Sequence, residues 1–138
     1  MRFTKEAIAV TETSKVPYFV DSSQAPTLVQ MPGLETTILT GLHDEQMMMV
    51  LNATLPGHDV PSHSHPHEQV GMVHGGKARL TIGGEERIVE AGDFYCIPAG
   101  VPHSDVCIGD EPFGMLDIFY PLREDFIARL REGSGSDE

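Results

Sequence analysis

The sequence contains no tryptophan, only two cysteines and no long apolar run. A membrane-spanning helix needs roughly 20 consecutive apolar residues, so none is expected here. Cys96 and Cys107 are too few for a disulfide framework and are predicted to be small core residues in a reducing compartment. The first residues lack the apolar segment of a secretory signal. These absences predict a soluble, cytoplasmic protein.

Basic side chains are also scarce. Nine lysines and arginines stand against 21 acidic residues, which gives a formal charge of −12. Such a charge repels a nucleic-acid backbone and an anionic membrane at long range, so neither is expected as a partner. A small anionic substrate is compatible with this charge, because an arginine beside a metal cation reverses the sign of the field inside a pocket.

The 138 residues suit one domain with one core. Residues 1–33 show little periodicity and are predicted to form an N-terminal arm or an edge strand, which could pack on a second subunit in a homodimer. Over residues 34–120, seven or more short alternating segments are separated by Gly and Pro turns. This pattern predicts an all-β protein, either a small barrel or a double-sheet sandwich. The pair Gly83-Gly84 predicts a tight hairpin between two of its strands.

Only the C-terminal part has a helical pattern. Leu122, Phe126, Ile127 and Leu130 fall on one helical stripe, which predicts a short helix over residues 121–132. Gly133 is the predicted stop of this helix. Residues 133–138 are rich in Gly and Ser and are predicted to be a disordered tail.

Three of the seven histidines lie within five residues, at positions 63, 65 and 67. On an extended strand, residues two apart share a face about 6.6 Å from each other, so His63 and His65 make a natural chelating pair. Further ligands must come from the same inner surface. Gln69, with the strand parity of His65, and the distant His103 are the candidates. The cluster predicts a site for a divalent metal ion.

Two spaced patterns carry a resemblance to the cupin superfamily over roughly residues 34–120. The first cupin motif is Gly, five residues, His-any-His, three or four residues, Glu, six residues, Gly. Here Gly57, His63, His65, Gln69 and Gly76 keep every interval, with Gln in place of Glu.

The second cupin motif is Gly, five residues, Pro-any-Gly, two residues, His, three residues, Asn. Gly92, Pro98, Gly100 and His103 match it, and Cys107 stands where Asn is usual. Two long motifs in the right order are a specific signal. By resemblance, the fold is a cupin jelly-roll β-barrel with a short C-terminal helix.

The resemblance also implies that His63, His65, Gln69 and His103 are the metal ligands. A neutral amide in place of a carboxylate leaves a +2 site, which makes the ion a stronger Lewis acid. With imidazole ligands and no thiolate, the donor set suits Zn, Ni, Mn or Fe without selecting among them. His67 and Glu68 lie outside the ligand pattern and are interpreted as residues of the rim that orient the ligands.

A narrower resemblance links the chain to the small cupins of pectin and alginate breakdown, which convert unsaturated uronates to linear keto forms, and to cupin polyketide cyclases. In the uronate enzymes, an Asp and a Phe on the last strand and a following Arg face the substrate; these correspond to Asp117, Phe119 and Arg123. Arg would pair with the sugar carboxylate and Asp would move a proton. This chain departs from that pattern at Gly71, where the enzymes place a polar residue. The resemblance lies in Gln69 and in residues 106–108, 116–119 and 121–126.

Three functions follow from these observations. The leading hypothesis is a divalent-metal cupin enzyme that isomerises or tautomerises a small oxygen-rich anion, such as a sugar acid. The second is an iron-dependent cupin dioxygenase, and the third is a ligand-sensing cupin without enzymatic activity.

Overall fold

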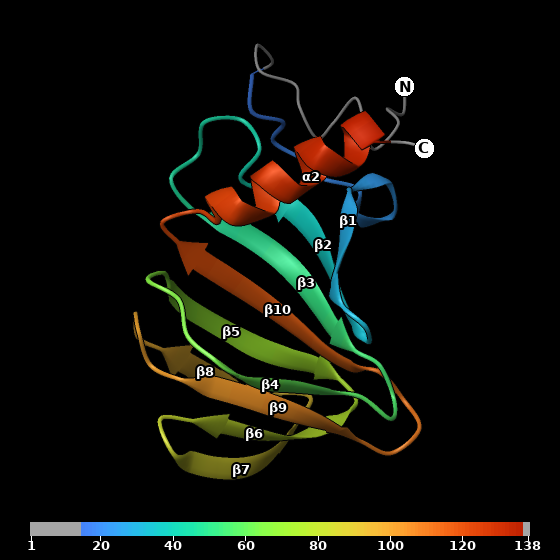
Figure 1. Ribbon diagram of the computed structural model, residues 1–138, viewed down its shortest axis with the longest axis vertical. Helices are drawn as coiled ribbons and strands as arrows, with labels where there is room; N and C mark the ends of the chain where they lie inside the picture. The colour runs from blue at the N-terminus through green and yellow to red at the C-terminus, as the bar shows by residue number, and fades with distance from the viewer. Residues whose placement is uncertain (1–14, 137–138) are drawn as a thin grey trace.

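The computed structural model of the chain describes residues 15–136, which form two antiparallel sheets packed face to face, with one helix at the C-terminal end (Figure 1). One sheet has six strands in the order β1-β2-β3-β10-β5-β8, and the other has four in the order β4-β9-β6-β7. The strands are β1 (Thr27–Met31), β2 (Leu34–Thr40), β3 (Met48–Thr54), β4 (Asp59–His63), β5 (Glu68–Gly75), β6 (Lys77–Ile82), β7 (Glu85–Glu90), β8 (Phe94–Ile97), β9 (His103–Ile108) and β10 (Phe113–Tyr120). A 3-10 turn, η1 (Ser22–Gln24), precedes them and α2 (Glu124–Ser136) follows them.

The predicted all-β jelly roll with a C-terminal helix is confirmed. The two sheets are not joined by strand pairing along their edges among the described residues, so the architecture is a sandwich and not a closed barrel. The hairpin predicted at Gly83-Gly84 is present between β6 and β7. Both glycines have positive φ, 57° and 86°, which the two-residue turn requires and which other residues adopt at a penalty.

Strand periodicity sorts the side chains into two interior clusters with polar residues between them. On β10, the inward positions are Met115, Asp117 and Phe119, all buried. Met115 belongs to an apolar cluster with β6, β7 and β9, and Phe119 belongs to another with β1, β2, β3 and α2. Asp117 lies between the two clusters, so the sandwich has a polar middle.

Part of the segment predicted to be an arm or an edge strand forms β1, at the edge of the larger sheet. The structure differs from the sequence predictions in three details. The strand at the histidine cluster, β4, ends at His63 and does not reach His65. Cys96 is exposed and not in the core, whereas Cys107 is buried; both thiols are free. The helix continues through Gly133 to Ser136, over part of the predicted tail. The rest of the proposed arm, residues 1–14, lies outside the described residues.

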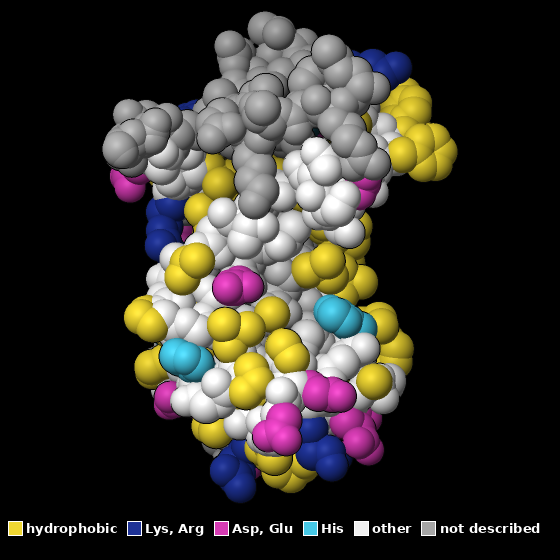
Figure 2. All heavy atoms as spheres, turned by 90° about the vertical axis from the view of Figure 1, so that its right-hand side faces the viewer, with side chains coloured by type: hydrophobic (Ala, Val, Ile, Leu, Met, Phe, Trp, Pro, Cys, Tyr) yellow, Lys and Arg dark blue, Asp and Glu magenta, His cyan; other side chains and the backbone are white. Residues whose placement is uncertain are grey.

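The exterior is mixed. Figure 2 shows hydrophobic side chains over the middle of one side of the molecule and charged side chains of both signs at the lower end, where Figure 1 places β6 and β7. Arg79 and Glu86 form an ion pair at that end, with 3.2 Å between nitrogen and oxygen. Within residues 15–136, no helix is long and apolar enough to cross a bilayer.

Candidate metal centre

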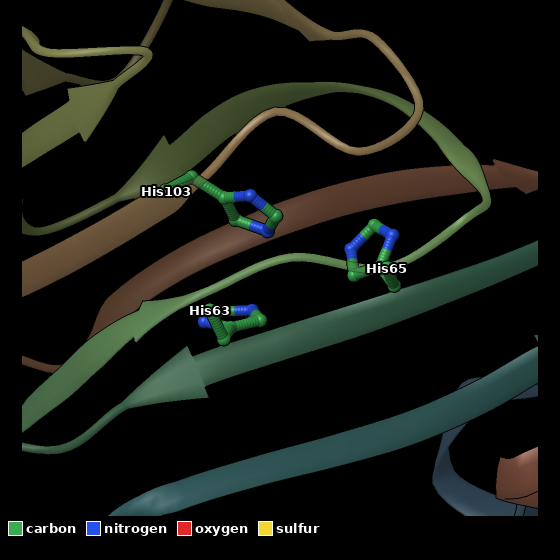
Figure 3. A group of neighbouring side chains, drawn as sticks. All are labelled: His63, His65 and His103. Atoms are coloured by element: carbon green, nitrogen blue, oxygen red, sulfur yellow. The ribbon is translucent and has the colours of Figure 1, made fainter.

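Two histidines from one stretch of the chain and a third, distant in the sequence, come together; His63 is exposed, His65 is half-buried and His103 is buried. His63 is the last residue of β4, His103 is the first residue of β9, and the two are paired in register. His65 lies two residues beyond β4, in the connection to β5, and not on the extended strand that the sequence predicts. One ring nitrogen from each residue lies within 4.8 Å of the other two, and Figure 3 shows the three rings around a common space. This spacing allows one ion to reach all three.

Backbone carbonyls determine the tautomer of all three rings. A carbonyl oxygen only accepts hydrogen bonds, so each Nδ1 carries the proton and donates it, and each Nε2 keeps its lone pair for a metal. The bonds are His63 Nδ1 to Pro61 O at 2.9 Å, His65 Nδ1 to His67 O at 3.0 Å and His103 Nδ1 to Val101 O at 2.9 Å. His67, which the sequence places at the rim, therefore orients a ligand through its carbonyl group.

Gln69 brings a fourth donor atom to the same place. Its side chain is buried, and its Oε1 lies 3.1 Å from His65 Nε2. Because His65 donates through Nδ1, this short contact joins two atoms that both present lone pairs. A cation bound by both atoms satisfies such an arrangement, and three imidazoles with one amide oxygen form a reasonable donor set for a divalent transition metal. The predicted ligands thus fit a metal ion.

The surroundings of His65 and His103 favour the neutral imidazole, which metal binding requires. Burial, the charge of Arg123 and the neighbouring His103 lower the pKa of His65 from 6.5 to about 4. Burial also lowers the pKa of His103, with further contributions from His63 and Arg123. The lowered pKa values favour the metal-binding form of both rings at neutral pH.

Arg123 and Phe119 lie beside the histidines. The ring of Phe119 packs edge-on against His65, with 5.6 Å between ring centroids. The Arg123 guanidinium stacks 4.9 Å from the Phe119 ring centroid and 4.1 Å from that of Phe126. Two of its nitrogens bond the carboxylate of Asp125, at 2.9 and 2.8 Å. The cation is thus close to the site and is already paired with an acid of its own chain.

Asp117 is placed differently from the other two residues that the narrower resemblance indicates. Its side chain has no exposed surface, and it accepts hydrogen bonds from Tyr95 at 2.5 Å, from Asn52 at 2.7 Å and from Gln69. Burial raises the pKa of Asp117, and the three hydrogen bonds act in the opposite direction. Direct proton transfer from Asp117 to a substrate stays a prediction.

Sequence reasoning missed Tyr95 and Asn52. Both point into the sandwich by strand parity, but they lie on β8 and β3 at positions that neither cupin motif specifies. The signal that could have found them is Gly71, the departure from the uronate-enzyme pattern. A Cβ at Gly71 would lie 2.6 Å from the Tyr95 hydroxyl and closer still to Asp117 Oδ1. Because Gly71 has no side chain, the Tyr95 hydroxyl and the Asp117 carboxylate can occupy this space and form their hydrogen bond.

Comparisons with known proteins agree with this geometry. The family model for the cupin domain matches residues 53–119, which include all four candidate ligands. The pectin degradation protein KdgF of Dickeya dadantii is 32% identical over 111 residues, which are 80% of this chain and 97% of that protein. Gentisate 1,2 dioxygenase 1 of Aquipseudomonas alcaligenes is 30% identical over 114 residues, 80% of this chain but only 31% of that longer protein.

Among solved structures, an RmlC-like cupin from Shewanella frigidimarina superimposes with a TM-score of 0.71 at 28% identity, covering 80% of this chain and 96% of that chain. The resemblance therefore extends from the spacing of the motifs to the fold of most of the chain. On its fold, its motifs and these relatives, the chain belongs to the cupin superfamily.

Proposed function

We propose that this protein is a divalent-metal-dependent enzyme that isomerises or tautomerises a small oxygen-rich anion, with an unsaturated uronate as the first substrate to test. The observation that carries the proposal is the convergence of three imidazole nitrogens and the Gln69 oxygen. The Nδ1 of each histidine donates to a backbone carbonyl, and the Gln69 amide donates to Asp117, so all four groups are oriented. The relative named for pectin degradation, matched over nearly its whole length, supports the choice of substrate class.

The chain's own residues would divide the work as follows. His63, His65, Gln69 and His103 would hold the ion. A bound divalent ion would supply Lewis-acid polarisation of a substrate oxygen. Arg123 would orient the anion, since a guanidinium pairs with a carboxylate through two parallel hydrogen bonds. A substrate carboxylate would compete with Asp125 for this group.

Phe119 would keep this arrangement in place. Its ring lies against both His65 and the Arg123 guanidinium, and its own side chain is 2% exposed. An apolar wall beside the guanidinium excludes water and strengthens the pairing with an anion. Phe119 would therefore act by packing, not by transferring a proton.

The test is to incubate the metal-loaded protein with a 4,5-unsaturated uronate monomer and follow the loss of its ring form by NMR. We expect turnover that stops when a chelator removes the metal. Arg123→Lys should raise KM about tenfold or more, because lysine cannot form the two-pronged contact. Arg129→Lys is the matched control, since Arg129 bonds the carbonyl of Val29 on β1 and lies outside the site. Turnover of the uronate that survives metal removal would contradict the proposal.

A second candidate is an iron-dependent dioxygenase. It is supported by the gentisate dioxygenase relative, of which this chain matches only one part. Oxygen uptake separates the two functions. Turnover that needs both Fe²⁺ and dioxygen, with none in Zn²⁺- or Ni²⁺-loaded protein, would replace the isomerase proposal. Turnover without oxygen consumption would exclude the dioxygenase for that substrate.

We also propose a homodimer that pairs through the outer face of the six-stranded sheet. On this face, two rows of cross-strand neighbours run over β3, β10, β5 and β8, and they contain apolar side chains and no charged ones. The chain as a whole carries a charge of −12. Two copies can therefore approach there without bringing like charges together, and a contiguous apolar surface of this kind is typical of an interaction site. The rows are Leu51-Leu116-Met72-Phe94 and Met49-Ile118-Val70-Cys96.

A further inference from the structure

The four candidate ligands of the metal centre are all neutral, and one of them, Gln69, is hydrogen-bonded to the buried carboxylate of Asp117. Gln69 lies on β5 and Asp117 on the neighbouring β10, where Gln69 is paired with Phe119 and Asp117 with Gly71. The side chains of Gln69 and Asp117 point inward and are hydrogen-bonded to each other. No salt bridge to Asp117 is formed by the described side chains. The carboxylate is therefore buried without a cation of the chain beside it.

The hydrogen bond between these two residues sets the direction of the Gln69 amide. A carboxylate accepts hydrogen bonds, so the amide presents its NH₂ group to Asp117, and its Oε1 then points to the opposite side. That side is the position 3.1 Å from His65 Nε2, where the lone pairs of the centre converge. With the amide reversed, an NH₂ group would point at the metal position and two oxygens would repel each other at Asp117.

We propose that Asp117 is a positioning residue of the metal centre, which aims the Gln69 oxygen at the ion and supplies the negative charge that the neutral ligands lack. This inference rests on the proposed metal centre and deepens it. Gln69 and Asp117 act as a matched pair: an amide bridges the metal ion and a carboxylate, with its oxygen toward the cation and its NH₂ toward the anion.

The surroundings of Asp117 are built to hold it in this role. Tyr95 donates to Oδ1 at 2.5 Å and Asn52 donates to Oδ2 at 2.7 Å. The Asn52 amide is itself oriented, because its oxygen accepts from the Thr36 hydroxyl at 2.5 Å. Gly71 provides the room for Tyr95 and Asp117 to meet. Each carboxylate oxygen thus has a directed donor from a different strand, which leaves the carboxylate little freedom to rotate.

The pairing predicts an unusual response to substitution. In Gln69→Glu, a second carboxylate faces Asp117 inside the sandwich, and two adjacent carboxylates cannot both ionise freely. A carboxylate at position 69 therefore binds the ion well only if position 117 becomes an uncharged donor. Asp117→Asn should weaken metal binding when residue 69 is Gln and strengthen it when residue 69 is Glu.

The test is a double-mutant cycle of the full chain with Gln69→Glu, Asp117→Asn and the combination of both. Zn²⁺ affinity is measured at neutral pH by competition with a chromophoric chelator, and Co²⁺ absorption spectra report the ligand geometry. We expect Asp117→Asn alone to lower Zn²⁺ affinity about 10–100-fold, the range for loss of a partner that orients a ligand. In the Gln69→Glu background, the same change should raise affinity about tenfold, with an altered Co²⁺ spectrum.

Asp105→Asn is the matched control, because Asp105 is also a buried inward carboxylate but bonds Thr54 and not a ligand. It should change Zn²⁺ affinity by less than about threefold in either background. An equal effect of Asp117→Asn in both backgrounds, with Zn²⁺ binding by the unmodified chain intact, would overturn the pairing alone. Absence of Zn²⁺, Ni²⁺ and Fe²⁺ binding by the unmodified chain would instead contradict the metal centre itself.

Discussion

At the level of single residues, two buried carboxylates share the polar middle of the sandwich but have different surroundings. Asp117 accepts three hydrogen bonds, whereas Asp105 accepts a side-chain hydrogen bond from Thr54 at 2.8 Å. Burial raises the pKa of Asp105 from 3.8 to about 6, the Thr54 bond opposes this shift, and the nearby Asp117 and Asp59 add to it. The difference in partners predicts that Asp105 opposes folding at neutral pH.

The sign of this effect follows from linkage. The folded chain binds the Asp105 proton more tightly than the unfolded chain does. The stability contributed by the protonated Asp105 is therefore complete below about pH 4 and is lost as the pH rises through about 6. Asp105→Asn should therefore stabilise the metal-free protein at pH 8 by about 1–3 kcal/mol, since one pKa unit corresponds to about 1.4 kcal/mol. Near pH 4 the gain should vanish.

Urea unfolding of both proteins at the two pH values, with a chelator present, measures this difference. Thr54 can donate to an asparagine oxygen as well as to a carboxylate, so the substitution keeps the hydrogen bond. A gain of the same size at both pH values would show that packing, not charge, is the cause.

At the level of elements, α2 connects the apolar cluster to the metal centre. Phe126 and Leu130 are 1% and 7% exposed in the cluster with β1, β2, β3 and β10. Phe126 also contacts the Phe119 ring edge-on, with 5.9 Å between centroids, and the guanidinium of Arg123. The helix therefore supports both the core and the proposed anion-binding side chain.

Phe126→Ala should lower the free energy of unfolding by about 3–5 kcal/mol, the range for removal of a buried aromatic ring. Thermal or urea unfolding followed by circular dichroism measures this loss. Arg131→Ala, at an exposed position of the same helix, should change stability by no more than about 0.5 kcal/mol. Equal effects of the two substitutions would show that α2 is not anchored by its apolar face.

At the level of the whole molecule, the six-stranded sheet buries one face in the sandwich and leaves an apolar face outside. Phe94 on β8 is 75% exposed on this outer face. In the proposed homodimer, two-fold symmetry places Phe94 of each subunit at the interface, so one substitution introduces two charges there. The interface is therefore sensitive to a single acidic substitution.

Light scattering should give the unmodified protein a mass of twice 15.1 kDa, and Phe94→Glu should reduce it to a single chain. Ile88→Glu is the control, because Ile88 is 53% exposed on β7 of the other sheet and should leave the dimer intact. An unmodified chain that is monomeric at micromolar concentration would contradict the proposal.

Local patterns were enough to predict much of this protein. Alternation with a period of two predicts strands because neighbouring side chains point to opposite faces, and most of the strands follow it. The intervals between His63, His65 and Gln69 lie in one stretch of chain, and the resemblance to the two cupin motifs added His103 to the predicted site. Positive φ at Gly83 and Gly84 was predictable because it too is a property of one stretch of chain.

Other features depend on which strands become neighbours, and this is decided by tertiary packing. The pairing of β5 with β10 and β8 brings Asp117 and Tyr95 together over Gly71. Strand parity predicts that these side chains point inward, but it does not predict which of them are in contact. The direction of the Gln69 amide and the burial of Asp117 depend on these contacts, because a buried polar group takes its orientation from partners that lie far away in the sequence.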